Sequence, residues 1–85
     1  MTAEAGRIRS MLADMIADAS DGEVSAAQAL AGDHSLAALG LTSLALIRLI
    51  DAIEDTFGVD LGTDMPSFDR FDTLANHLTG LLAAR

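Results

Sequence analysis

Large apolar residues recur in the first part of the chain at the spacing of one face of an α-helix. Between residues 2 and 19 they fall at i, i+3, i+4, i+7, i+8 and i+11, which are Ile8, Met11, Leu12, Met15, Ile16 and Ala19. This period predicts an amphipathic helix whose apolar stripe faces a core. Thr2 is the expected N-cap, and residues 20–23, which include Gly22, are expected to end the helix.

A second amphipathic helix is predicted over residues 43–57. Its core stripe also follows helical spacing and consists of Leu46, Leu49, Ile50, Ile53 and Phe57. Thr42 is the expected N-cap, and Gly58 is the expected left-handed residue that ends the helix. The chain is therefore organised around this central helix.

Two apolar residues of the central helix, Leu44 and Ile47, lie off its core stripe. Charged residues surround them on the same side: Arg48, Asp51, Glu54 and Asp55. One interpretation is that the loop of residues 20–42 folds over the two side chains. The other, which we favour, is that they are exposed and form a contact patch for a partner protein.

Residues 24–42, between the two helices, have only patchy apolar periodicity. This pattern predicts a long loop. Four of its apolar residues are expected to hold it across the core: Val24, Leu30, Leu36 and Leu39. Residues 26–31 are expected to form a short helical turn within it.

The last part of the chain predicts a short helix and then a long one. Residues 59–62 indicate an extended connection, and Asp64 or Ser67 is expected to cap a brief helical turn around residues 66–70. Asp72 then opens a final helix, whose apolar residues keep helical spacing through residue 83: Phe71, Leu74, Leu78, Leu81 and Leu82. We expect an all-α fold, a small four-helix bundle of three main helices and one short helix with a long first loop.

Composition favours one small domain held together by packing. The 85 residues suffice for a single core but not for a scaffold with a buried enzyme cleft, and a hydrophobic content of 51% argues against disorder. With no cysteine, neither a disulfide framework nor a thiolate metal site is available. We expect residues 1–85 to form one domain, and a monomer, because no heptad seam favours a dimer.

The charge balance points to protein partners with basic surfaces. Thirteen acidic residues against five basic ones give a net charge of −8, which repels nucleic acid and anionic lipid. No apolar run approaches the roughly 18 residues that span a bilayer, and the N-terminus lacks a signal-peptide pattern. We expect a cytoplasmic protein that acts neither on nucleic acid nor at a membrane.

Ser43 carries the candidate chemistry. It stands where a glycine-containing loop becomes the central helix, and unpaired amides and the helix dipole at such a position favour a phosphate ester. The two histidines, His34 and His77, fit neither a catalytic triad nor a metal-ligand spacing, and residues 40–44 are not a G-x-S-x-G elbow. We therefore expect Ser43 to be an attachment point in a protein that is not an enzyme and holds no metal.

Residues 39–44, with the sequence LGLTSL, and the amphipathic helix that follows them resemble the phosphopantetheine attachment site of acyl and peptidyl carrier proteins. The resemblance covers nearly the whole chain, including the long first loop with residues 33–36 and a last helix opened by residues 71–74. It implies that Ser43 bears 4′-phosphopantetheine, transferred from coenzyme A by a separate phosphopantetheinyl transferase. The terminal thiol would hold acyl or aminoacyl groups as thioesters.

The resemblance also gives roles to the neighbours of Ser43. Gly40 would let the loop turn closely before the helix, Thr42 directly precedes the attachment serine, and Leu44 would form the apolar part of the surface read by partner enzymes. The rest of that surface would consist of Ile47, Arg48, Asp51, Glu54 and Asp55. The implied partners are the loading, condensing and tailoring enzymes of polyketide, nonribosomal peptide or fatty-acid-type biosynthesis.

The chain departs from the common pattern of this family at three positions. Thr42 stands where most acyl carriers have Asp, and Ala45 and Arg48 stand where many fatty-acid carriers have acids. The pattern S-L-x-x-x-R-L, which begins at Ser43, is closer to peptidyl carriers and carriers of specialised metabolism. Acyl and aminoacyl cargo therefore both stay open. We expect a freestanding carrier, although a domain cut from a synthase would look alike.

Two other functions stay open at this stage. The chain could be an unmodified helical adaptor that binds a partner through Leu44, Ile47 and the acidic rim. It could also be a small serine hydrolase that uses Ser43, although no base accompanies that serine in the sequence.

Overall fold

The computed structural model describes residues 3–31, 35–61 and 70–84, and these ranges contain five helices. They are α1 (Ala3–Ala19), α2 (Ala26–Leu30), α3 (Leu36–Leu39), α4 (Ser43–Phe57) and α5 (Phe71–Ala83). Outside them, an isolated bridge joins Ser35 to Arg70. The prediction of a small all-α fold is confirmed.

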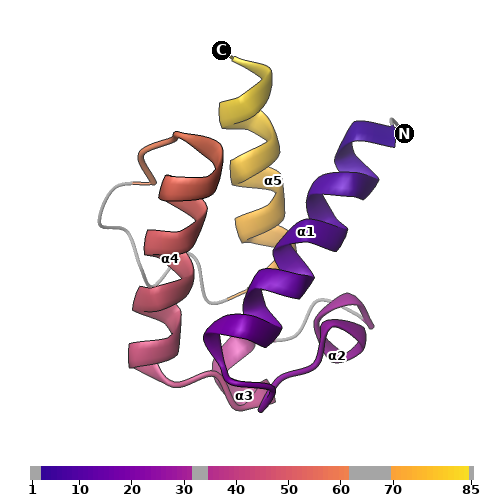
Figure 1. Cartoon of the computed structure of the whole chain (residues 1–85). Coiled ribbons are helices and arrows are strands. Elements are labelled where there is room, and N and C mark those ends of the chain that lie inside the picture. The colour runs from indigo at the N-terminus through magenta and orange to yellow at the C-terminus, as the bar shows by residue number, and fades with distance from the viewer. Residues whose placement is uncertain (1–2, 32–34, 62–69, 85) are drawn as a thin grey trace.

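The three long helices form the body of the molecule (Figure 1). The end of α1, the short helices α2 and α3 and the start of α4 gather at the lower end of the view, whereas α1 begins and α5 ends at the upper end. The start of α4, where Ser43 lies, is therefore close to the connections rather than to the free ends of the long helices.

One core joins the helices. The buried apolar side chains come from all three long helices and from the connections: Ile8, Leu12, Ala13, Ile16, Val24, Ala29, Leu36, Leu41, Ala45, Leu49, Ile50, Ile53, Leu61, Phe71, Leu74, Ala75 and Leu78. Burial of this apolar surface is the main favourable contribution to folding. Leu46 and Phe57, which were predicted for the core stripe of α4, are partly buried and pack against this cluster.

A polar contact joins α1 to the start of α5. The guanidinium of Arg9 donates a hydrogen bond to the carboxylate of Asp72 at 2.8 Å, and it lies 4.8 Å from the centre of the Phe71 ring. Both charged side chains are partly buried, which makes this ion pair stronger than one in open water. Asp72 was expected to open the last helix, which begins one residue earlier at Phe71.

The long loop contains more helix than the sequence predicts. The expected turn at residues 26–31 is present as α2, where Ser25 and Gln28 form a reciprocal capping box. α3 was not predicted. Its N-cap is Ser35, whose hydroxyl accepts a hydrogen bond from the backbone N–H of Ala38, and its C-cap is Gly40 in the left-handed region.

Two burial predictions are wrong at the edge of the core. Leu30 was expected to hold the loop to the core, and its side chain is 43% exposed, whereas Leu41 takes a buried position. Met11 was assigned to the stripe of α1 and is 36% exposed. The expected cap at Thr2 and the short helix near residues 66–70, with Asp64 or Ser67 as its cap, lie outside the described residues apart from Arg70.

Candidate functional site

Ser43 is the first residue of α4, and its side chain is exposed. Thr42 is the N-cap, as predicted: its hydroxyl accepts a hydrogen bond from the backbone N–H of Ala45 at 3.1 Å, and its carbonyl accepts from Leu46 at 2.9 Å. These bonds fix the first turn of α4. Ser43 is thereby held at a helix N-terminus and open to solvent.

The segment that precedes Ser43 is also held in place by backbone contacts and by burial. Gly40 has φ of 114°, a conformation that L-residues rarely adopt, and it ends α3. The backbone N–H of Leu41 then donates to the carbonyl of Leu36 at 2.9 Å, and the Leu41 side chain is buried. The turn expected at Gly40 is present, and Leu39 packs against the core as expected. Nothing in the periodicity of the loop singled out Leu41.

Leu44 and Ile47 are exposed on the outer side of α4. Their exposed fractions are 57% and 45%, so the described part of the loop leaves both accessible. Arg48, Asp51 and Asp55 are exposed as well. The interpretation in which the loop buries the two apolar residues is therefore wrong.

The side chain of Glu54 joins α4 to the segment that follows the helix. It is half-buried, and its carboxylate accepts a hydrogen bond from the backbone N–H of Leu61 at 2.9 Å. This bond fixes the chain after Gly58, which ends α4 in the left-handed region as predicted. Glu54 thus stabilises the end of the helix, in addition to the partner-facing role expected for it.

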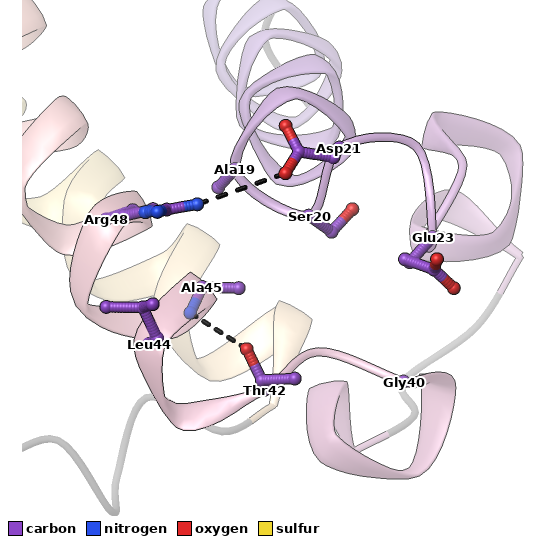
Figure 2. Close-up of a pocket in the computed structure, with 9 residues that line it drawn as sticks. All are labelled: Ala19, Ser20, Asp21, Glu23, Gly40, Thr42, Leu44, Ala45 and Arg48. Carbon is purple, nitrogen blue, oxygen red and sulfur yellow. Dashed lines mark hydrogen bonds and ion pairs between the residues drawn. The ribbon is translucent and has the colours of Figure 1, made fainter.

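A hollow of about 230 Å³ lies between the turn after α1 and the start of α4 (Figure 2). Nine residues line it: Ala19, Ser20, Asp21, Glu23, Gly40, Thr42, Leu44, Ala45 and Arg48. Across it, the guanidinium of Arg48 lies 3.9 Å from the carboxylate of Asp21. The hollow combines two segments that are distant in the sequence, residues 19–23 and 40–48, so sequence patterns did not reveal it.

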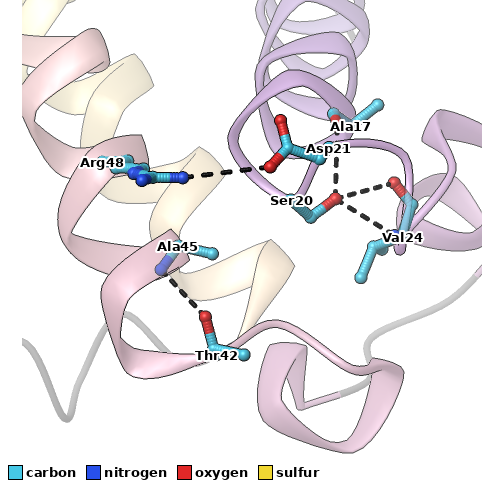
Figure 3. A network of polar contacts seen from close by, with 7 residues as sticks. All are labelled: Ala17, Ser20, Asp21, Val24, Thr42, Ala45 and Arg48. Carbon is cyan, nitrogen blue, oxygen red and sulfur yellow. Dashed lines mark hydrogen bonds and ion pairs between the residues drawn. The ribbon is translucent and has the colours of Figure 1, made fainter.

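The turn that forms one wall of the hollow is closed by its own hydrogen bonds (Figure 3). The Ser20 hydroxyl accepts from the backbone N–H of Val24 at 3.1 Å and lies 3.2 Å from the carbonyl of Ala17, to which it can donate. Asp21 and Gly22 both have positive φ, 54° and 84°. The backbone N–H of Gly22 donates to the carbonyl of Ala17 at 2.9 Å, which completes a Schellman-type end of α1.

These features fit a phosphate ester on Ser43. The acceptor hydroxyl is exposed, its backbone is fixed by the cap at Thr42, and it lies at the positive end of a helix of 15 residues. Amides at such an end favour a negative charge. Two other residues predicted for the site, Gly40 and Leu44, come before and after Ser43 in the chain, and both line the hollow.

The chain also matches a known family by sequence. The family model described as the phosphopantetheine attachment site matches residues 7–78. No curated protein and no solved structure matches the chain. Among the described residues, none of the helices has the length and apolarity to cross a membrane. Because the match covers most of the chain, from α1 into α5, this protein belongs to the phosphopantetheine attachment site family, that of the acyl and peptidyl carrier proteins, whose members hold 4′-phosphopantetheine covalently.

Proposed function

We propose that Ser43 is the residue that carries the 4′-phosphopantetheine of this protein. The observation that carries the proposal is the exposed hydroxyl of Ser43 at the first position of α4. The amides and dipole of this helix end favour the negative charge of a phosphodiester, by about 0.3–1 kcal/mol at an exposed site.

The residues around Ser43 present the acceptor rather than react themselves. Thr42 fixes the first turn of α4 through its bond to Ala45, and the left-handed turn at Gly40 with the buried Leu41 fixes the approach to it. When attached, the group supplies a terminal thiol that holds acyl or aminoacyl cargo as a thioester. Domains of this family are generally non-catalytic, and we propose that catalysis resides in partner enzymes.

We propose that these partners contact the outer side of α4. Leu44 and Ile47 supply its apolar part, and four charged residues surround them: Arg48, Asp51, Glu54 and Asp55. A small apolar centre within a polar rim is typical of a protein–protein contact. The partners are a phosphopantetheinyl transferase and the loading, condensing or tailoring enzymes of polyketide, nonribosomal peptide or fatty-acid-type biosynthesis.

The described helices share one core, which supports the proposal that residues 1–85 form a single carrier domain. The carrier contributes by tethering. A tethered substrate reaches each partner at a raised effective concentration, which increases the rate without a catalytic group on the carrier.

Intact mass spectrometry tests this function. The full chain is incubated with coenzyme A and a phosphopantetheinyl transferase of broad specificity, and we expect a mass increase of one pantetheine arm. Ser43→Ala abolishes the increase, whereas Ser10→Ala, at an exposed serine on α1, retains it. An unchanged mass of the natural sequence with several transferases would contradict the proposal.

The exposure of Leu44 and Ile47 also supports a second candidate, an unmodified helical adaptor. For an adaptor, Ser43→Ala leaves the function intact and Leu44→Asp removes it. For a carrier, both substitutions impair the function. The same two variants therefore separate the two candidates.

A further inference from the structure

The hollow beside Ser43 already contains a positively charged side chain. Arg48 reaches from α4 toward the turn after α1, and its guanidinium lies 3.9 Å from the carboxylate of Asp21 (Figures 2 and 3). Glu23 lines the hollow from the same turn, and Leu44 lines it from α4. A cation with an apolar stem therefore matches the chemistry of this hollow, since acidic groups and an apolar wall face it together.

The ion pair between Arg48 and Asp21 can be broken with little loss of folding stability. The two side chains are 57% and 87% exposed, and their charged atoms are farther apart than in a close hydrogen-bonded pair. Exposed ion pairs of this kind contribute little to stability. A cation from another protein can thus replace Arg48 at Asp21 without unfolding any part of the chain.

The position of the hollow indicates which partner would reach it. Thr42 and Leu44, the residues on both sides of Ser43, line the hollow. An enzyme that transfers a group to the Ser43 hydroxyl must bring its active site to that residue. Enzymes that act on the thiol work at the far end of a long arm, so their active sites need not come as close to Ser43.

We propose that the hollow binds a lysine or arginine side chain of the phosphopantetheinyl transferase, which replaces Arg48 at Asp21 and is also attracted by Glu23. The proposal rests on the proposed attachment at Ser43 and extends the partner surface from α4 to the turn after α1. The net charge of −8 adds a long-range attraction for a basic partner. Arg48 is then an internal competitor for the cation of the transferase rather than a contact that favours its binding.

Removal of the two carboxylates tests the attraction. In the full chain, Asp21→Asn with Glu23→Gln is expected to lower kcat/KM of loading by roughly tenfold at low ionic strength, mainly through KM. The control, Asp14→Asn with Asp60→Asn, removes the same charge from exposed positions that do not line the hollow and is expected to change kcat/KM by less than about twofold. Equal effects of the two double variants would overturn the proposal.

Removal of the internal competitor gives an effect of opposite sign. Arg48→Gln is expected to raise kcat/KM of loading by roughly two- to threefold, since Asp21 is then free for the transferase. Arg7→Gln, at an exposed position of α1, makes the same change in net charge and serves as the control. A decrease for Arg48→Gln would overturn the proposal, because Arg48 would then itself favour binding.

Asp21→Gly separates binding from folding. Glycine adopts the positive φ of 54° at this position without a Cβ clash, so the melting temperature is expected to stay the same or rise. Loading is nevertheless expected to fall several-fold, as for Asp21→Asn.

Equal loading of all these variants would overturn the role of the hollow while the attachment at Ser43 stands. If no transferase modifies even the natural sequence, the attachment itself fails and the role of the hollow fails with it.

Discussion

The two sides of α4 carry similar apolar residues in opposite surroundings. Ile53 on the inner side is fully buried in the core, whereas Ile47 on the outer side is 45% exposed and has charged neighbours. The inner side holds α4 against the rest of the fold, and the outer side is the surface that we propose for contacts with other proteins. The comparison teaches that position around the helix, rather than apolarity, separates the structural role of a residue from its partner-binding role.

The largest expected effect contrasts two isoleucines. Ile53→Ala removes fully buried methylene and methyl groups and is expected to lower the free energy of unfolding by about 2–5 kcal/mol. Ile47→Ala is expected to change it by less than about 0.5 kcal/mol, because the side chain is partly exposed in the folded protein. Urea unfolding followed by circular dichroism measures both. Comparable losses of unfolding free energy in the two variants would contradict the assignment of different roles to the two sides of α4.

Two arginine–aspartate pairs give a smaller contrast of the same kind. Arg9→Gln removes a partly buried ion pair with Asp72 and the contact with the Phe71 ring, and we expect a loss of about 1–2 kcal/mol. Arg48→Gln removes the exposed contact with Asp21, and we expect a loss below about 0.5 kcal/mol. The same unfolding experiment applies, and an equal loss for Arg48→Gln would show that this pair is structural.

The smallest expected change in stability accompanies a change in function. Leu44→Asp places a charge at an exposed position of α4, so the free energy of unfolding should change by less than about 0.5 kcal/mol. The rate of loading by the transferase is expected to fall by roughly tenfold. Leu30→Asp is the matched control, because Leu30 is an exposed leucine on α2. Equal loading of the two variants would contradict the role of Leu44 at a partner surface.

The sequence predicts the long helices well because each is long enough to show a period. α1 was placed over residues 2–19 and is described as Ala3–Ala19, and α4 has its predicted bounds, Ser43–Phe57, with the predicted caps Thr42 and Gly58. The phase of Leu44 and Ile47 on the helix places them off the core stripe, and the structure then shows that both are exposed. The position of Ser43 at the start of α4 could therefore be predicted without the structure.

Other features depend on contacts that no local pattern contains. α3 has four residues, too few to show a helical period, and only its cap at Ser35 and the glycine at its end could have indicated it. The burial of Leu41 in place of Leu30 depends on the tertiary packing of the loop, which its patchy periodicity does not show. The hollow at Asp21 and the pair of Arg9 with Asp72 join residues that are distant in the chain.

The most direct test of the central claim is the location of the attached group. After incubation with coenzyme A and the transferase, the protein is digested and the modified peptide is identified by tandem mass spectrometry. We predict one phosphopantetheine arm per chain, on Ser43, and no modified peptide from Ser43→Ala. An arm on another serine, or a natural sequence that stays unmodified with several transferases, would contradict the account.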